Sequence, residues 1–340
     1  MHKHKTLMTL LILSIPIFFI LNLILGSVSI PIADVFAILS GSETESEAWT
    51  NIVMNTRLPQ TLTAIACGAG LSIAGLEMQT VFHNPLAGPS VLGISSAASL
   101  GVAFVVLLSG AIGGGLMSRF GFFGNTALTI AAIIGALLVM MLIVYLSQKV
   151  SGNATLLIAG VLIGYIATAI IGVLKYFSSE EEIRAYVIWG LGSFARVTGG
   201  QVYVFVGLMA LILPFTMLLA KPLNMLLMGD QYAQNLGLNI RRARMLIICT
   251  AGILTAVVTA YCGPIMFIGL AVPHIARGLF RTEDHRILLP ATLFCGASLA
   301  LICNLIARLP GFEGALPINS VTALIGAPVA LTILLKRNKQ

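Results

Sequence analysis

The sequence predicts an all-α polytopic membrane protein, and three observations support this fold class. Hydrophobic residues make up 58% of the 340-residue chain and charged residues only 9%, whereas a soluble domain is nearer ~25% charged. Apolar runs recur along the chain at about 20 residues each, the length that crosses ~30 Å of hydrocarbon. Lys and Arg concentrate in short segments between some of these runs, which is typical of cytoplasmic loops.

We expect ten membrane-spanning helices. The run from Met245 to Ala276 is too long for one span, and Gly263-Pro264 divides it because proline cannot donate a backbone hydrogen bond. The expected spans lie near Leu7–Leu25, Leu58–Thr80, Ser90–Leu108, Asn125–Leu146, Thr155–Tyr176, Val202–Ala220, Met245–Tyr261, Ile265–Phe280, Ile287–Ala307 and Ile318–Leu335.

Charge predicts that both termini are cytoplasmic. An even number of spans places both basic ends on one side, together with most of the 19 Lys and Arg residues. The net charge of +7 therefore reflects membrane topology and not nucleic-acid binding. With no polar linker or soluble segment in the sequence, residues 1–340 are expected to form a single transmembrane domain. Short helices are plausible in the longest outer segments, 26–56 and 177–201.

The segment from Lys221 to Arg244 mixes charged, amide and glycine residues between two apolar runs. Asp230 can cap a short helix over Gln231–Leu236, and Gly237 can end that helix in a left-handed conformation. Asn239 can cap a second helix that continues into the next span. Two short helices on a membrane surface favour a docking surface, and a solvated connector is the alternative.

Catalytic motifs are missing from the sequence, which contains neither the P-loop pattern GxxxxGK[ST] nor HExxH. The chain is therefore not expected to be an enzyme or to hydrolyse ATP, and an ion gradient or a partner must supply any energy it uses. The five cysteines lie in or beside apolar runs without metal-ligand spacing, so no metal site is expected. His83 and His274 are interpreted as turn and packing residues.

Glu77 is the acid expected within a span, about one turn from its cytoplasmic end. Acids within the membrane are costly and often functional, so Glu77 could titrate in a proton-coupled transporter. The favoured interpretation is a carboxylate that reaches interfacial water or pairs with a base in a loop, because no relay partners are evident.

Arg57-Leu58-Pro59 and Arg308-Leu309-Pro310 repeat one tripeptide on the expected outer face. Each arginine could pair with an acidic docking protein, or with Glu313 of this chain. A snorkelling anchor at the membrane surface is the alternative.

Five ordered blocks of the sequence resemble the FecCD-type permease subunits of bacterial ABC importers for ferric siderophores, haem and vitamin B12. The resemblance covers about residues 57 to 336. Its blocks are RLPQTLTAIACGAGLSIAGLEMQTVFHNPLAGPSVLGIS (57–95), MGDQYAQNLGLNIRRAR (228–244), GPIMFIGLAVPHIAR (263–277), DHRILLPATLFCGASL (284–299) and LPINSVTALIGAPVALTILLKR (316–337).

The resemblance implies a type II ABC importer architecture, a homodimer in the bacterial inner membrane with a path lined largely by the fifth and tenth spans. Two separate ATPase subunits, which use ATP and Mg, would bind the cytoplasmic face, and an extracytoplasmic binding protein would deliver substrate. This chain would bind no cofactor itself. Residues 221–244 would form the coupling helices, with these residues near the ATPase: Gly229, Asp230, Leu236, Gly237 and Arg241.

The resemblance also assigns roles outside the coupling segment. Arg57 and Arg308 match rim arginines that pair with glutamates of the binding protein, although Gln60 stands where some relatives carry another base. The cytoplasmic gate would involve Gly152, Asn153 and Thr155. Glu77 falls where relatives usually carry an apolar residue, so its role is open.

The expected function is import of an iron chelate, a ferric siderophore or haem, by alternating access. A vitamin B12 (cobalamin) permease is the alternative within this class. An ion-coupled secondary transporter using Glu77 is the alternative from another class.

Overall fold

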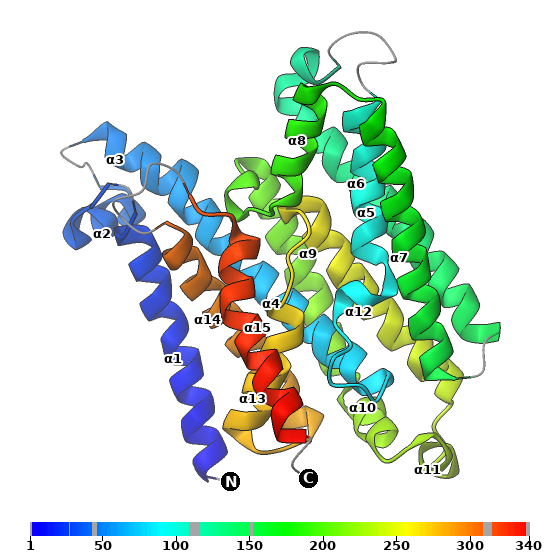
Figure 1. Ribbon diagram of the computed structural model, residues 1–340. Helices are drawn as coiled ribbons and strands as arrows, with labels where there is room; N and C mark the ends of the chain where they lie inside the picture. Colours follow the sequence, from blue (N-terminus) through cyan, green and yellow to red (C-terminus); the bar gives the residue numbers. More distant parts are fainter. Residues whose placement is uncertain are drawn as a thin grey trace.

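The computed structural model describes residues 2–26, 28–42, 46–108, 116–149, 152–308 and 315–337, and every regular element among them is a helix. The long helices run side by side in one bundle (Figure 1). They are α1 (His2–Ile24), α4 (Leu58–Val81), α5 (Ile94–Leu107), α6 (Leu116–Lys149), α7 (Asn153–Tyr176), α9 (Gly200–Met217), α12 (Ile240–Cys262), α13 (Ile268–Phe280), α14 (His285–Ala307) and α15 (Ile318–Arg337).

Each of the ten predicted spans coincides with one of these helices. Within the described ranges, seven helical stretches are long and apolar enough to cross a membrane, whereas Ile94–Leu107, Ile268–Phe280 and the fully described part of α15, Ile318–Thr332, are shorter. The break predicted at Gly263-Pro264 is confirmed: α12 ends at Cys262, and Gly263 leaves the helix with φ of 79°. The total of ten spans stays a prediction, because α5 and α13, with 14 and 13 residues, are short for the hydrocarbon thickness.

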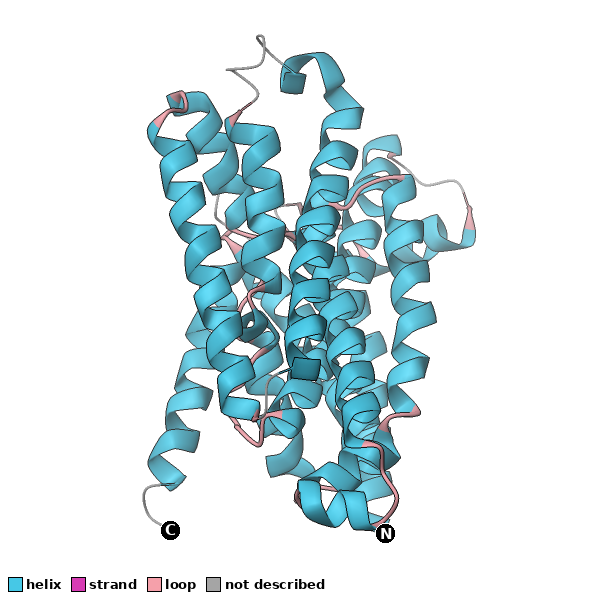
Figure 2. Cartoon of the chain, turned by 90° about the vertical axis from the view of Figure 1, so that its right-hand side faces the viewer, coloured by secondary structure: helices cyan, strands magenta, loops and turns pink. Residues whose placement is uncertain are grey.

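Short helices occupy both long segments predicted to lie outside. These are α2 (Ile32–Ser40), α3 (Glu47–Ile52), α8 (Glu180–Gly190) and the single turns η1 (Val53–Arg57) and η3 (Phe194–Arg196). A capping box starts α8, where Ser179 N donates to Glu182 Oε2 and Glu182 N donates to Ser179 Oγ. Figure 2 shows irregular segments within the height of the bundle as well as at its ends.

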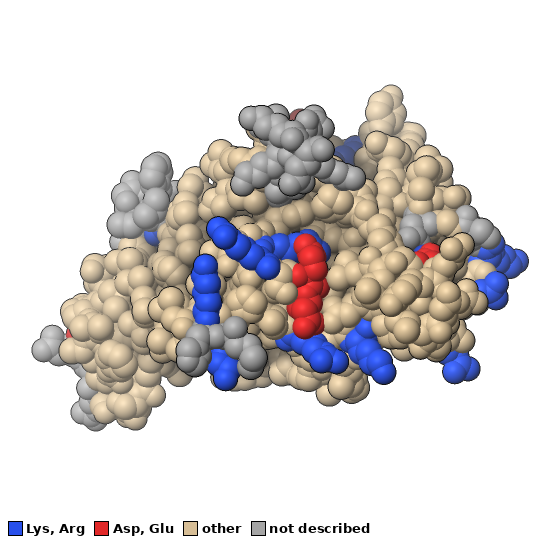
Figure 3. Space-filling model, turned by 90° about the horizontal axis from the view of Figure 1, so that it is seen from below, with Lys and Arg blue, Asp and Glu red and all other residues tan. Residues whose placement is uncertain are grey.

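The two terminal helices begin and end at the same end of the bundle, where α10 (Ala220–Leu227) and α11 (Asp230–Asn235) also lie (Figure 1). Figure 3 views this end and shows Lys and Arg side chains spread over it. Its exposed bases include Lys3, Lys5, Lys221, Arg241, Arg242, Arg281 and Arg286. Both termini therefore share one side, and its assignment to the cytoplasm stays a prediction from charge.

Helix α4 is the centre of the bundle. It is buried from Pro59 to Val81 except at two positions, Leu62 and Ile65, and it contacts α9, α12, α13 and α14. Small residues permit this crowding, since hydrophobicity alone does not drive helices together in lipid. A Cβ at Gly75 would overlap the carbonyl oxygen of Gly269 in α13, and one at Gly68 would overlap that of Gly296 in α14.

We expect Gly75→Ala to destabilise the protein by about 1–3 kcal/mol, because the added methyl group overpacks the α4–α13 contact. The measurement is the thermal unfolding midpoint of the purified chain in detergent. Gly207→Ala in α9 is the control, since a Cβ there would meet nothing within 4 Å, and its midpoint should be unchanged or slightly higher. Equal midpoints for the two variants would contradict the close contact.

Candidate coupling surface and its polar network

Two glycines shape the segment between α9 and α12. Gly229 precedes α11 with φ of 95°, and Gly237 follows it with φ of 86°. Both values lie in the region that residues with a Cβ rarely adopt. Helix α10 buries Leu223 and Leu226 against the bundle, and the glycines turn α11 out from it as a separate short helix. The segment is therefore a defined structure and not an irregular connector.

The predicted caps of this segment are confirmed in two places. Leu238 N donates to Ala233 O at 3.0 Å and Gly237 N donates to Gln234 O at 2.9 Å, which is a Schellman motif at the end of α11. Asn239 Oδ1 accepts from Arg242 N at 3.1 Å and caps α12.

The predicted cap by Asp230 is wrong. Helix α11 starts one residue earlier than expected, so Gly229 occupies the N-cap and Asp230 is the first helical residue. Asp230 Oδ2 instead accepts a charged hydrogen bond from Arg244 Nη2 at 2.5 Å, which joins α11 to α12. The residue is thus structural within the segment, although in a different role.

The segment presents a mixed apolar and basic surface. Leu236 is 52% exposed, and Tyr232 and Met228 are also exposed. Arg241 and Arg242 lie exposed in the first turn of α12. Contiguous exposed apolar side chains rimmed by polar groups mark interaction surfaces. Of the five predicted coupling residues, Leu236 and Arg241 are on this surface, while Gly229, Gly237 and Asp230 shape it.

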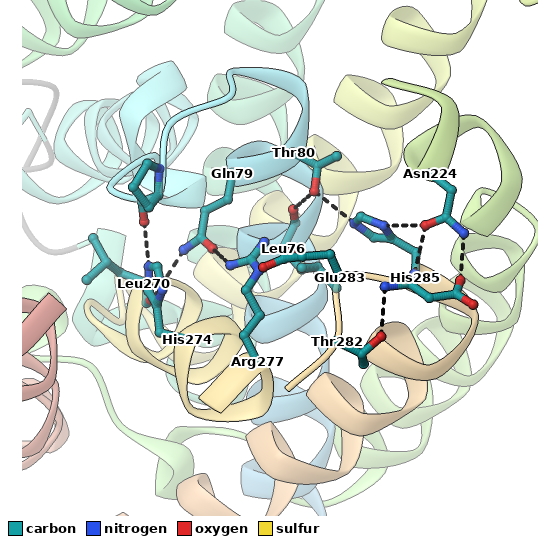
Figure 4. Close-up of polar contacts among 12 residues, drawn as sticks. Leu76, Gln79, Thr80, Asn224, Leu270, His274, Arg277, Thr282, Glu283 and His285 are labelled. Atoms are coloured by element: carbon teal, nitrogen blue, oxygen red, sulfur yellow. Dashed lines mark hydrogen bonds and ion pairs between the residues drawn. The ribbon is translucent and has the colours of Figure 1, made fainter. Parts of the chain in front are cut away.

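A polar network connects α10 to the bundle (Figure 4). Asn224 in α10 donates from Nδ2 to Asp284 Oδ1 at 2.6 Å, and its Oδ1 accepts from His285 N at 2.8 Å. Asp284 also caps α14, because the same Oδ1 accepts from Arg286 N at 3.0 Å. These hydrogen bonds, first from the Arg286 backbone and then from Asn224, hold the pKa of the Asp284 carboxyl below its usual value.

His285 extends the network into the centre of the bundle. Its Nδ1 lies 2.9 Å from Asn224 Oδ1, and its Nε2 lies 2.9 Å from Thr80 Oγ1 in α4. Asp284 fixes the amide orientation of Asn224, so Oδ1 faces His285 and the imidazole carries a proton on Nδ1. The imidazole is fully buried. Two side chains, Asn224 and His285, therefore connect α10 to α4.

A second branch joins α4 to α13. Arg277 Nη1 donates to Gln79 Oε1 at 2.5 Å and Arg277 Nε donates to Glu283 Oε2 at 3.0 Å, while Gln79 Nε2 donates to Leu270 O. The two histidines singled out in the sequence both contact backbone carbonyls. His83 Nε2 is 2.8 Å from Leu226 O in α10, and His274 Nε2 is 2.7 Å from Pro85 O.

Sequence reasoning missed Asn224, His285 and Gln79. The available signal was weak: Gln79-Thr80 is a polar pair near the end of an apolar span, and Asp284-His285 precedes another. The spacing of these residues in the sequence does not indicate that they are in contact, since Thr80 and His285 are 205 residues apart.

The two repeated arginines lie together at the other end of the molecule. Both guanidinium groups lie beside Gly26. A Cβ added to Gly26 would be 2.9 Å from Arg308 Nη2 and 3.0 Å from Arg57 Nη2. Arg57 is only 1% exposed, and it donates to the carbonyls of Leu23 and Ile24 at the end of α1 and of Val28 just beyond it. It is therefore neither a snorkelling anchor nor exposed on the rim of this chain. Arg308 is half-buried, Glu313 lies outside the described residues, and docking stays a prediction.

Glu77 differs from its favoured interpretation. Its side chain is fully buried between α4 and α12, where Oε2 accepts from Thr250 Oγ1 at 3.0 Å. Among the described residues no base contacts it, and its Oε1 has no hydrogen-bond partner. Glu77 therefore does not reach interfacial water or pair with a loop base. No acidic, histidine or lysine side chain of the described chain forms a hydrogen-bonded relay with it.

The predicted gate residues lie at the start of α7. Gly152 is its N-cap with φ of 122°, Asn153 is its first residue, and Thr155 is exposed. Residues 150 and 151 lie outside the described residues, and the gate role stays a prediction.

Two irregular segments, the turn that precedes α5 and the stretch between α12 and α13, lie between α7 and α15 on one side of the bundle (Figure 1). Gly160 and Gly164 of α7 pack against Gly93, where α5 begins. A small cavity of about 150 Å³ separates residues 86–91 from residues 265–270. Asn319 connects α15 to the stretch between α12 and α13. Its Nδ2 donates to Pro264 O at 2.7 Å, and its Oδ1 accepts from Met266 N at 3.0 Å.

This bundle of apolar helices, with a structured surface segment tied to its central helix, is that of a membrane permease. The chain belongs to the FecCD transport family, whose model matches residues 12–336. Members of this family are membrane permease subunits of ABC transporters.

Known relatives and solved structures agree with this assignment. The chain is 38% identical over 284 residues to the vitamin B12 import system permease protein BtuC of Klebsiella pneumoniae, covering 84% of this chain and 82% of that protein. It is 37% identical over 287 residues to BtuC of Escherichia coli, covering 84% of each. A metal-chelate type ABC transporter solved in an inward-facing conformation has a TM-score of 0.84 at 27% identity, covering 98% of this chain and 99% of that one.

A second solved structure shares the fold alone. PsaBC from Streptococcus pneumoniae, in complex with Fab, has a TM-score of 0.53 at 18% identity and covers 89% of this chain and 95% of that one.

We expect Asn224→Ala to destabilise the protein by about 1–3 kcal/mol, because His285 loses its acceptor and Asp284 loses a donor. The thermal unfolding midpoint in detergent measures this loss. Asn235→Ala, at an exposed position at the end of α11, is the control and should change stability by no more than about 0.5 kcal/mol. A midpoint for Asn224→Ala equal to that of the control would show that the network does not contribute to stability.

Proposed function

We propose that this chain is the transmembrane permease subunit of an ATP-driven importer that moves a metal chelate of the cobalamin class into the cytoplasm. The observation that carries the proposal is the coupling segment, two short surface helices of which the first, α10, is tied by Asn224 and His285 to the central helix α4. A partner ATPase that closes on binding ATP would move α10 and α11, and the network would pass that movement to α4 and α14.

Cobalamin is preferred over an iron chelate as the substrate. The curated relatives described above are vitamin B12 permeases at 37–38% identity, which gives the alternative more support than the iron chelate expected from the sequence. Ferric siderophores and haem are the second candidates. The solved neighbour of the metal-chelate type is compatible with both classes.

A homodimer with its path along the α7 and α15 faces is part of this proposal. Both helices carry large apolar side chains that this single chain leaves exposed: Ile158, Leu162, Tyr165, Ile166, Leu324 and Leu331. A second copy would cover part of this surface and line the remainder as a path. Such a path offers apolar contact and few ligands, which suits a bulky chelate that is released and not retained.

The other partners follow from the two ends of the bundle. Two ATPase subunits would bind the surface of α10 and α11, at the basic end that we assign to the cytoplasm. A substrate-binding protein would bind the opposite end, where Arg308 is one of the half-buried bases. The membrane would be the bacterial inner membrane.

We expect Gly237→Pro to reduce ATP-dependent uptake at least about tenfold without reducing the amount of protein in the membrane. Proline requires φ near −65°, whereas Gly237 has φ of 86°, and it removes the N–H that bonds Gln234 O. Gly237→Asn is the matched control, because Asn tolerates the left-handed region and keeps its N–H. Uptake by Gly237→Pro at the level of Gly237→Asn would argue against a role for this turn in coupling.

The direct test is uptake in proteoliposomes that contain this chain, its ATPase and its binding protein. Cobalamin, a ferric siderophore and haem are offered in parallel, with and without ATP. We expect ATP-dependent accumulation of cobalamin. ATP-dependent accumulation of an iron chelate instead would overturn the substrate but keep the class of transporter. Uptake that followed an imposed proton gradient and ignored ATP would overturn the class and favour an ion-coupled transporter using Glu77.

A further inference from the structure

A cleft between α1 and α14 opens at the basic end of the molecule. It encloses about 300 Å³ and is lined by His4, Lys5 and Met8 from α1 and by Arg286 and Ile287 from α14. Farther along the bundle the two helices are held together, with Ser14 Oγ and Ser298 Oγ 2.8 Å apart and Asn22 Nδ2 donating to Leu301 O at 3.2 Å. The cleft is therefore the open end of a fixed helix pair.

Basic groups from both helices surround this cleft. His4, Lys5 and Arg286 line it, and Lys3 is exposed next to them on α1. The neighbouring acids are engaged elsewhere: Asp284 caps α14 and accepts from Asn224, and Glu283 pairs with Arg277. His4 is held by its ring contact with Phe280, at 6.1 Å between centroids. The site has the charge that complements a phosphate group.

An apolar surface continues from the cleft along α1. Met8 and Ile287 form its apolar part, and Ile12, which lies one turn beyond Met8 on the same face of α1, is 45% exposed. A free phosphate would use only the bases. A phospholipid would use both parts, with its headgroup among the bases and its acyl chains along the apolar side chains.

We propose that the cleft between α1 and α14 is a binding site for an anionic phospholipid of the cytoplasmic leaflet, with Lys5 and Arg286 holding the phosphate. Basic pockets between helices at the cytoplasmic surface suit such headgroups. The proposal depends on the placement of this end in the cytoplasm and is independent of the transported substrate. The bound lipid would fix the N-terminal helix to the α14 end of the network.

The test is native mass spectrometry of the full-length chain, titrated with phosphatidylglycerol or phosphatidylcholine. We expect the wild-type chain to bind phosphatidylglycerol in preference to phosphatidylcholine. Lys5→Gln and Arg286→Gln should each weaken phosphatidylglycerol binding roughly fivefold, and the double variant roughly 25-fold. Lys221→Gln removes one exposed charge from α10 at the same end and should leave binding unchanged. The double replacement Lys5→Arg with Arg286→Lys keeps both charges and should retain binding.

Three results would overturn the proposal. The first is equal binding of the two lipids by the wild-type chain. The second is loss of binding in Lys221→Gln equal to that in Lys5→Gln, which would indicate general surface charge. The third is displacement of phosphatidylglycerol by an equal concentration of soluble glycerol phosphate, which would show an anion site that does not use the acyl chains. Unfolding midpoints of all variants show whether each is folded.

Discussion

In lipid an unpaired backbone polar group has no water to bond, and this constraint governs how the chain breaks its helices. At three such helix ends, a side chain from a distant element supplies a hydrogen-bond partner. Asn319 binds the backbone on both sides of the break between α12 and α13. Arg57 donates to the last two carbonyls of α1, and His274 contacts Pro85 O beyond α4. Each break thereby fixes the position of another helix.

Hydrogen bonds from side chains to the backbone of another helix also hold the candidate coupling surface to the bundle. His83 binds Leu226 O, and Asn224 binds the start of α14, so α10 is attached to both α4 and α14. Because these contacts are hydrogen bonds of defined direction, they resist sliding better than apolar contacts do. Close approach at Gly75 and Gly269 then makes α4 and α13 move together. In the proposed mechanism, a displacement of α10 would act on α4 and α14 through these hydrogen bonds.

Sequence predicted what local rules decide and missed what depends on the assembled bundle. The helices, the break at Gly263, and the caps at Gly237 and Asn239 follow from hydropathy and backbone conformation within a few residues. Asp230 was misplaced because a helix start can shift by one residue, which changes the partner of its side chain. Arg57 and Glu77 were expected near water, and both are buried, because nothing in a sequence of apolar spans shows which helix is central.

Glu77 lies in the packed interior of the bundle and not on the surface proposed to line the substrate path. A carboxyl enclosed by α4 and α12, with Thr250 as its hydrogen-bond partner, lies away from the exposed apolar faces of α7 and α15. The coupling network lies at one end of α4, and the surface suited to a substrate lies on α7 and α15. In the proposed function, coupling and substrate selection would therefore depend on different residues. Under that proposal, the transported chelate could be changed through residues on α7 and α15 and through the binding protein, without changing the hydrogen bonds that attach α10 to α4 and α14.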